Sequence, residues 1–152
     1  MKNTKNDQTK EEMILVDEMG NSQINKEMEK TLKNSYSPYS KIKVACVLEF
    51  ADGSTFCGCN VENASYPCGL CAERNAIFGA IAHGKDVKKV VEVHIASDQE
   101  SMFFPCGACR QVLSEHLNVN TRISVYAKVK KSKQFKKFTT TLLDLLPFAF
   151  KL

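Results

Sequence analysis

The chain has 152 residues, of which 43% are hydrophobic and 25% charged, and its formal net charge is +4. This composition is typical of one globular domain and excludes a disordered, collagen-like or coiled-coil chain. No apolar run reaches the roughly 18 residues that a membrane span needs. The polar start MKNTKNDQTKEEM also lacks the apolar core of a signal peptide. We therefore expect a soluble, cytoplasmic protein.

The beginning of the chain differs from the rest. Residues 1–22 are polar apart from one short apolar stretch, and we expect them to form a mobile N-terminal extension. Residues 23–152 are predicted to form a single domain. It begins with a surface helix, because apolar residues recur every four positions at Ile24, Met28 and Leu32.

The remaining elements alternate between strands and helices. In chain order they are predicted as a hairpin over 44–57 with an Asp-Gly turn, a helix over 71–83, a strand over 90–95, a helix over 109–117, strands over 122–129 and 135–139, and a short helix over 142–146. Hairpin strands followed by alternating helices and strands predict an α/β fold, here a three-layer α/β/α sandwich with a mixed β-sheet.

Six lysines gather near the predicted strands at the end of the chain: Lys128, Lys130, Lys131, Lys133, Lys136 and Lys137. Such a cluster can bind nucleic acid. However, these lysines alternate with apolar residues around a turn-like sequence, and no aromatic and arginine surface accompanies them. We interpret them as a solvated hairpin and predict no nucleic-acid partner.

The chain contains an odd number of cysteines, at positions 46, 57, 59, 68, 71, 106 and 109. An odd count in a chain without an apparent signal peptide argues against a disulfide framework and favours metal binding or catalysis. Three of these cysteines lie where the middle helices begin, in Cys71-Ala72-Glu73 and in Pro105-Cys106-Gly107-Ala108-Cys109. The unpaired N–H groups of a helix N-terminus favour the thiolate form.

Zinc accepts thiolates in a tetrahedral shell, so two helix N-termini that meet can offer it three sulfurs and leave a fourth position for water. Glu73 lies two positions after a candidate ligand, where its carboxylate can carry protons between that water and a substrate. Arg74 and Arg110 neighbour the two motifs, and we expect both to withdraw charge from the sulfurs.

A closed structural zinc site is the alternative, because Cys68 forms a second Cys-x-x-Cys pair with Cys71. Together with Cys106 and Cys109 it would complete a shell of four thiolates. A redox role for either pair leaves the Cys-x-Glu sequence unexplained. Cys46, Cys57 and Cys59 are interpreted as small hydrophobic residues of the sheet.

The pattern Cys-x-Glu followed by Pro-Cys-x-x-Cys is similar to the signature of zinc deaminases. Over residues 35–150 the chain resembles the small homotetrameric cytidine deaminases. The matching stretches are Ser37-Pro38-Tyr39-Ser40, Gly58-Cys59-Asn60-Val61-Glu62-Asn63-Ala64-Ser65-Tyr66, Cys71-Ala72-Glu73-Arg74, Pro105-Cys106-Gly107-Ala108-Cys109-Arg110-Gln111 and Leu145-Leu146-Pro147.

The resemblance implies a role for individual residues. It makes Glu73 the general acid and base, and it implies one Zn²⁺ per subunit with Cys71, Cys106 and Cys109 as ligands. Asn60 and Glu62 would bind the ribose hydroxyls, Ala64 and Tyr66 would line the site, and Phe150 would stack on the base bound by a neighbouring subunit of a homotetramer.

The activity implied by the resemblance is hydrolytic deamination of cytidine and deoxycytidine to uridine and deoxyuridine, with release of ammonia, in pyrimidine salvage. A zinc-activated hydroxide would attack the base, and Glu73 would shuttle the protons. Two residues depart from the family pattern: Ile42 replaces a common Phe, and Phe148 replaces a small or polar residue. The alternatives are a deaminase of another cytosine nucleoside, such as a blasticidin-type antibiotic, and the structural zinc module.

Overall fold

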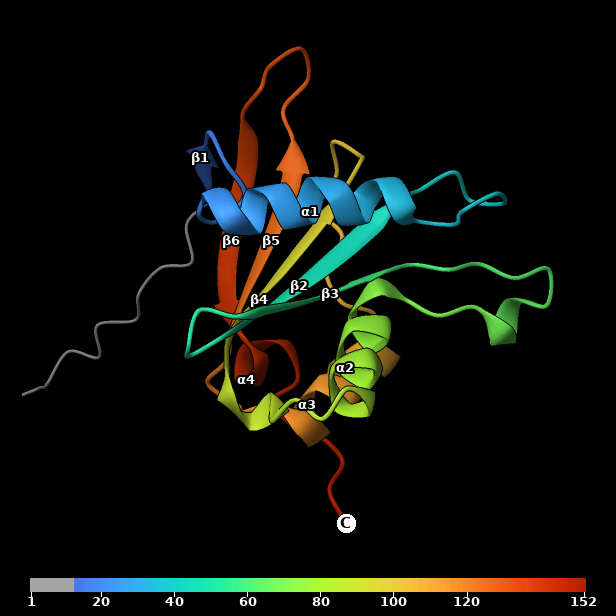
Figure 1. Ribbon diagram of the computed structural model, residues 1–152, viewed down its shortest axis with the longest axis vertical. Helices are drawn as coiled ribbons and strands as arrows, with labels where there is room; N and C mark the ends of the chain where they lie inside the picture. The colour runs from blue at the N-terminus through green and yellow to red at the C-terminus, as the bar shows by residue number, and fades with distance from the viewer. Residues whose placement is uncertain (1–12) are drawn as a thin grey trace, which may run out of the picture.

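The computed structural model describes residues 13–152. One six-stranded sheet with the order β1-β6-β5-β4-β2-β3 runs through it (Figure 1). Its strands are β1 (Ile14–Val16), β2 (Val44–Phe50), β3 (Thr55–Cys59), β4 (Val90–Ser97), β5 (Arg122–Lys128) and β6 (Phe135–Thr141). The central neighbours β4 and β5 are parallel and the other neighbours antiparallel, so the sheet is mixed as predicted.

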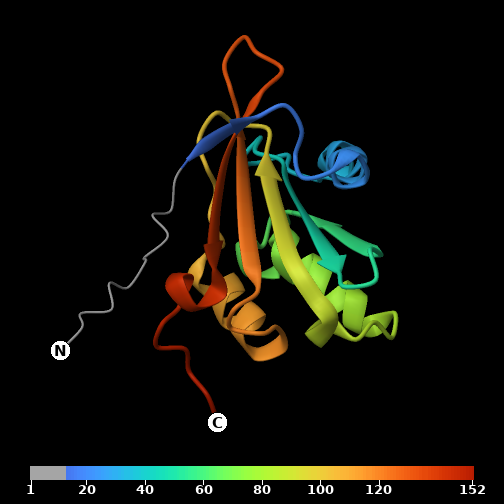
Figure 2. The ribbon, with the colours of Figure 1, turned by 90° about the vertical axis from the view of Figure 1, so that its left-hand side faces the viewer.

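Helices cover both faces of the sheet (Figure 2). They are α1 (Ser22–Asn34), α2 (Ala72–Ala82), α3 (Gly107–His116) and the short α4 (Leu142–Leu145), with 3₁₀ turns η1 (Tyr66–Cys68) and η2 (Val87–Lys89). Alternate residues of β2 separate the two cores: Ala45 and Val47 pack on the α1 side, and Cys46 and Leu48 pack on the side of α2 and α3. The predicted three-layer sandwich is therefore confirmed.

The helix α1 begins and packs as its sequence predicts. The side chain of Asn21 accepts hydrogen bonds from the backbone N–H groups of Gln23 and Ile24, both at 3.0 Å, and so caps the helix. Ile24 and Met28 are fully buried against the sheet. The helix ends at Asn34, and the loop that follows leads into β2.

The N-terminal segment is more ordered than predicted. Residues 14–16 form the edge strand β1, which pairs antiparallel with β6, and Met19 is buried in the core beneath α1. The expectation of a mobile extension is wrong for this part, because pairing with β6 and burial of one side chain anchor it. Residues 1–12 lie outside the described part of the chain.

The lysine-rich segment forms the β5–β6 hairpin, which extends beyond the body of the sheet in Figure 1. Lys128, Lys130, Lys131 and Lys133 are exposed there, as expected for a solvated hairpin. Lys137 lies further along β6, 3.9 Å from a carboxylate oxygen of Glu92. Within residues 13–152 no helix has the length and apolar character needed to cross a membrane.

Close contact between α2 and β3 fixes the position of the helix that carries the first cysteine motif. Gly58 of β3 faces the backbone of α2: a Cβ at this position would lie 2.3 Å from the backbone nitrogen of Ala76 and 2.7 Å from the carbonyl oxygen of Ala72. Only a glycine permits this approach. The first turn of α2, which holds the predicted catalytic carboxyl, is therefore set directly against the sheet.

Candidate active site

The two middle helices both begin at a cysteine. Cys71 is the N-cap of α2, and Cys106 is the N-cap of α3, with Cys109 one turn further along. The three sulfurs lie within 4.8 Å of one another, and those of Cys71 and Cys106 are 4.0 Å apart. A tetrahedral zinc shell with Zn–S bonds of about 2.3 Å separates its sulfurs by about 3.8 Å. Three thiolates on this geometry fit a zinc ion and leave one position of its shell free.

The fourth cysteine of the alternative hypothesis is not part of this group. Among the described residues, the group of potential ligands at this place consists of Cys71, Cys106 and Cys109 alone. Cys68 is exposed at the end of η1. The arrangement is therefore an open site, as in catalytic zinc centres, and not the closed four-thiolate shell of a structural centre.

Neighbouring donors stabilise the thiolate form of Cys71, one of the three candidate ligands. A hydrogen bond from the Cys109 thiol and one from Arg74 lower the pKa of Cys71 to about 5. The Nη2 atom of Arg74 lies 3.6 Å from the Cys71 sulfur. The predicted role of Arg74 beside the sulfurs thus has a direct contact, and its guanidinium offsets part of the negative charge of the thiolates.

Arg110 has different partners from those predicted. Its Nε donates to the carbonyl oxygen of Pro105 at 2.8 Å, and its Nη1 donates to that of Leu145 at 3.3 Å. Neither bond goes to a sulfur. The contacts of Arg110 therefore do not support the expectation that it withdraws charge from the thiolates. The side chain instead ties the loop before α3 to the end of α4, because a guanidinium has enough donors to bridge two carbonyl groups.

Glu73 lies in the first turn of α2, and only 5% of its surface is exposed. Burial raises the pKa of its carboxyl above the usual range, and the nearby negative charge of Cys71 acts in the same direction. A carboxyl with a raised pKa keeps its proton to a higher pH than an exposed one, which favours a role as proton donor and acceptor. Its place beside the thiol cluster suits it to proton transfer and not to metal ligation.

A cavity of about 530 Å³ adjoins the thiol cluster. Cys71 and Arg74 form one part of its wall, and Asn60, Glu62 and Tyr66 form another. The remaining wall residues are Tyr39, Ser40, Val61, Asn63, Gly69 and Leu70. The structure thus brings the predicted sugar-binding pair and one predicted metal ligand into the same cavity, while Ala64 is exposed outside its wall.

Most of the hydrogen-bonding capacity of Asn60 is used within the protein. Its Oδ1 accepts from Ser35 Oγ at 2.5 Å and from the backbone nitrogen of Val44 at 2.8 Å. Its Nδ2 donates to the carbonyl oxygen of Ile42 at 2.9 Å. An amide nitrogen carries two hydrogens, so one N–H of Asn60 remains for a ligand. These bonds fix the orientation of the amide before any ligand arrives.

Glu62 is bound to the preceding loop. Its Oε2 accepts from the backbone nitrogens of Tyr39 and Ser40, at 2.9 and 3.2 Å, and its Oε1 accepts from the Ser40 hydroxyl. The hydrogen bond from Ser40 is the largest cause that lowers the pKa of Glu62, so the group is a carboxylate at neutral pH. The recorded partners of the Glu62 carboxylate therefore all belong to the loop between α1 and β2.

Phe150 is not among the residues that line the cavity of its own chain. Gln111 of α3 holds its backbone: Gln111 Nε2 donates to the Phe150 carbonyl oxygen at 3.0 Å, and the Phe150 nitrogen donates to Gln111 Oε1 at 3.3 Å. As whole residues, Phe150 is 66% exposed and Phe148 is 95% exposed. Phe150 is therefore presented to the surroundings and is not part of the core.

Sequence reasoning assigned no role to Ser35, Ser40 and Gln111, whose hydrogen bonds hold Asn60, Glu62 and Phe150 in place. Each lies in or next to a motif, but its partner is a side chain or backbone group 22 to 39 positions away. Contacts over this separation depend on how the elements pack. Only the quoted stretches around Ser40 and Gln111 indicated that these positions matter.

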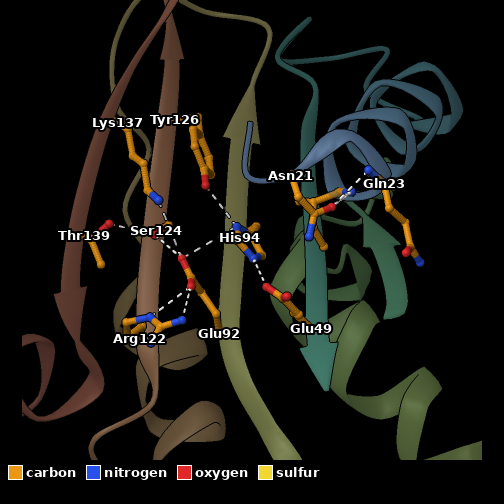
Figure 3. A network of polar contacts seen from close by, with 11 residues as sticks. Asn21, Gln23, Glu49, Glu92, His94, Arg122, Ser124, Tyr126, Lys137 and Thr139 are labelled. Atoms are coloured by element: carbon orange, nitrogen blue, oxygen red, sulfur yellow. Dashed lines mark hydrogen bonds and ion pairs between the residues drawn. The ribbon is translucent and has the colours of Figure 1, made fainter. Parts of the chain in front are cut away.

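A second group of potential ligands lies across the sheet on the α1 side (Figure 3). Both ring nitrogens of His94 already have partners, Glu49 Oε2 at 2.8 Å and the Tyr126 hydroxyl at 3.0 Å. Glu92 accepts two hydrogen bonds from Arg122 at 2.7 and 2.9 Å. Because these groups satisfy one another, we interpret the network as part of the framework.

An open group of three thiolates beside a buried, proton-holding carboxyl and a polar cavity defines a metal-dependent hydrolase. Residues 20–125 match the family described as the cytidine and deoxycytidylate deaminase zinc-binding region. The match spans more than half of the sequence, and the chain belongs to this family. The family is named for the metal that the three thiolates fit.

Relatives and solved structures agree with this assignment. The chain is 39% identical over 124 residues to a cytidine deaminase of Sporosarcina psychrophila, covering 82% of this chain and 86% of the relative. It is 38% identical over 117 residues to a cytidine deaminase of Mycoplasma pneumoniae, covering 76% and 84%. The crystal structure of cytidine deaminase from Burkholderia pseudomallei superposes with a TM-score of 0.73 at 35% identity, covering 82% of this chain and 94% of that one.

Proposed function

We propose that this protein is a zinc-dependent cytidine aminohydrolase that converts cytidine and deoxycytidine, with water, into uridine and deoxyuridine, with release of ammonia. The observation that carries the proposal is the convergence of three sulfurs from two helix N-termini next to the buried Glu73. The zinc ion, held by Cys71, Cys106 and Cys109, supplies an activated water when bound. The cavity beside it has room for a nucleoside.

Glu73 moves the protons in this proposal. Its raised pKa lets the protonated carboxyl donate to ring N3 of cytosine, which makes C4 more electrophilic. After water has added at C4, the Glu73 carboxylate takes up the proton of the new hydroxyl group and passes it to the amino group, which leaves as ammonia while C4 becomes the carbonyl carbon of uridine. Because Glu73 is buried at the start of a helix that packs on the sheet, it stays in place through both transfers.

Asn60 and Glu62 bind the sugar in the proposed complex. Asn60 offers one N–H donor, and the Glu62 carboxylate accepts. A single hydroxyl can satisfy both, because it can accept from one and donate to the other. This supports activity on both ribose and deoxyribose nucleosides. Tyr66 contributes an exposed aromatic ring at the cavity mouth, in edge contact with Tyr39 at 6.3 Å between ring centres.

We further propose a homotetramer in which Phe150 of one subunit stacks on the base bound by its neighbour. The exposed ring of Phe150, held by Gln111 outside its own cavity, supports this arrangement. Pyrimidine salvage in the cytoplasm is the proposed setting. All seven cysteines are free thiols, which suits a reducing compartment.

The experiment that tests the reaction measures the change in ultraviolet absorbance from cytosine to uracil while zinc is quantified on the same sample. The Glu73→Gln variant should retain one zinc ion per chain and lose nearly all turnover of cytidine and deoxycytidine. Full activity in this variant would overturn the proposed proton transfer. Wild-type protein that contains zinc but turns over neither nucleoside would contradict the proposed reaction itself.

Mixed oligomers test the shared site. A Glu73→Gln chain has an intact Phe150, and a Phe150→Ala chain has an intact Glu73. Loss of Phe150 should raise KM for cytidine, because the base loses a stacking partner. If Phe150 stacks on the base in a neighbouring subunit, mixing the two variants should create sites that have both native residues. These sites should restore part of the activity at low cytidine concentration. No restoration in oligomers shown to exchange subunits would mean that Phe150 acts within its own chain or not at all.

A further inference from the structure

The loop between α1 and β2 makes close contacts with the proposed sugar-binding carboxylate. Two of its backbone N–H groups, those of Tyr39 and Ser40, bind Oε2 of Glu62. The hydroxyl of Ser40 binds the other oxygen, Oε1. Ser40 therefore supplies the side-chain hydrogen bond that Glu62 receives among the described residues, and both side chains line the cavity next to the thiol cluster.

The same hydroxyl also organises its own loop. Ser40 Oγ accepts a hydrogen bond from the backbone nitrogen of Ile42 at 3.1 Å. Lys41, between them, adopts the left-handed conformation with φ 62°, and its nitrogen donates to the Ser37 carbonyl oxygen at 3.1 Å. A residue other than glycine reaches this conformation at a cost, so the loop needs such local bonds to keep its shape.

The two carboxylate oxygens of Glu62 are left with different capacities. A carboxylate oxygen accepts about two hydrogen bonds, and Oε2 already has two donors. Oε1 has the Ser40 hydroxyl and room for one more donor. A sugar hydroxyl would therefore bind at Oε1, beside Ser40. Without the Ser40 hydroxyl, the backbone donors would still hold Oε2, but Oε1 would be free to rotate about it.

We propose that Ser40 is a positioning residue for sugar recognition, which orients Oε1 of Glu62 toward the hydroxyl of the bound nucleoside. The inference rests on the proposed function, in which Glu62 binds the sugar. Ser40 contacts neither the thiol cluster nor Glu73, so it acts on binding of the sugar and not on the chemistry at C4. Its effect is expected in KM, with zinc content unchanged.

The test compares Ser40→Ala with Ser40→Thr, which keeps the hydroxyl. Ser37→Ala is the matched control, because Ser37 is in the same loop and its side chain makes no hydrogen bond recorded within the described residues. Ser40→Ala should raise KM for cytidine about 10- to 100-fold, the range for losing one hydrogen bond to a charged group. Its kcat should stay within about twofold. Ser40→Thr should restore most of the affinity, and Ser37→Ala should behave as wild type.

Sugar analogues separate positioning from a general effect on the loop. The same variants are assayed on 2′-deoxycytidine and 3′-deoxycytidine. The ratio of KM in Ser40→Ala to KM in wild type should fall to about one for the analogue that lacks the hydroxyl bound by Glu62. That analogue has no hydrogen bond to Glu62 that the substitution could weaken. An equal penalty on all three substrates, or a loss of kcat that Ser40→Thr does not rescue, would overturn the proposal.

Glu62→Gln distinguishes failure of this inference from failure of the proposed function. If Glu62→Gln leaves KM unchanged for every nucleoside, the proposed sugar role of Glu62 is wrong and the inference falls with it. If Glu62→Gln raises KM but Ser40→Ala does not, only the positioning role of Ser40 is wrong. Thermal unfolding of each variant checks that the fold is kept. If Ser40→Ala is unstable, Ser40→Cys takes its place, because a thiol is a much weaker donor than a hydroxyl and should also raise KM.

Discussion

The Nη2 atom of Arg74 lies 3.6 Å from the sulfur of Cys71, the residue three positions earlier in the chain. Its Nε is buried and has no hydrogen-bond partner among the described residues. Three thiolates and one Zn²⁺ carry a net negative charge, which opposes the activation of bound water. The guanidinium of Arg74 offsets part of this charge at one sulfur. Helix geometry brings the two side chains together, since residues three apart share a helix face.

Replacing Arg74 with Gln removes this positive charge and preserves much of the side-chain volume. We expect kcat for cytidine to fall about 10- to 100-fold, the usual range for partners of metal ligands. Zinc affinity should also decrease, because the Cys71 thiolate loses a stabilising donor. Steady-state kinetics together with competition for zinc by a chelator measure both effects.

Arg110→Gln is the matched control for that experiment. Arg110 bridges the carbonyl oxygens of Pro105 and Leu145, so its loss should lower thermal stability more than it lowers zinc affinity. Equal losses of zinc affinity in the two variants would contradict the inference that Arg74, and not Arg110, stabilises a thiolate.

Substitution of single cysteines tests the open zinc site. Cys68→Ser should retain one zinc ion per chain, since Cys68 is outside the thiol group, whereas Cys106→Ser should lose most of its zinc because only two sulfurs remain. Metal analysis after exhaustive dialysis measures the content of each variant. Release of zinc from Cys68→Ser would instead support a closed structural shell.

The network around Glu92 predicts a pH-dependent stability (Figure 3). Although burial opposes it, hydrogen bonds from Ser124 and Arg122 and the proximity of His94 give a lowered pKa for Glu92 in the folded protein. The stabilisation is therefore complete above the unfolded value of about 4.3 and is lost as the pH falls through the lower folded value. Glu92→Gln should reduce the free energy of unfolding near pH 7 by about 1–3 kcal/mol.

Denaturant unfolding at several pH values measures this difference. The difference in the free energy of unfolding between wild type and Glu92→Gln should be constant near neutral pH and should become smaller below about pH 4. A difference that does not depend on pH would show that the variant acts through packing alone. Glu29→Gln on the exposed side of α1 serves as a control and should leave the pH profile of the wild type unchanged.

Gly58→Ala tests the close approach of α2 to β3. The added Cβ would overlap the backbone of Ala72 and Ala76, so α2 must shift away from the sheet at a cost of about 1–3 kcal/mol or more. Since α2 carries Cys71 and Glu73, activity should also fall. Gly107→Ala is the control for thermal unfolding, because its Cβ would meet no atom within 4 Å. Equal melting temperatures for the two variants would contradict this account.

Local features of this protein could be predicted from residue order. The four-residue recurrence of Ile24 and Met28 predicted α1, and the Asp-Gly turn predicted the β2–β3 hairpin, because both signals depend on neighbours in the chain. Likewise, the spacing of the cysteine motifs and the resemblance they carry indicated the zinc chemistry.

The combination of those features in space depends on long-range packing. The tertiary structure brought the sulfur of Cys71 within 4.0 Å of that of Cys106, 35 residues away, and it left Cys68 outside the group. It also directed Arg74, and not Arg110, to a thiolate, and it paired residues 14–16 with β6. These outcomes depend on the packing of α2 and α3 against one sheet and on strand pairing between distant segments. Residue order and local preference do not specify such long-range contacts, because each is selected only when the whole core is assembled.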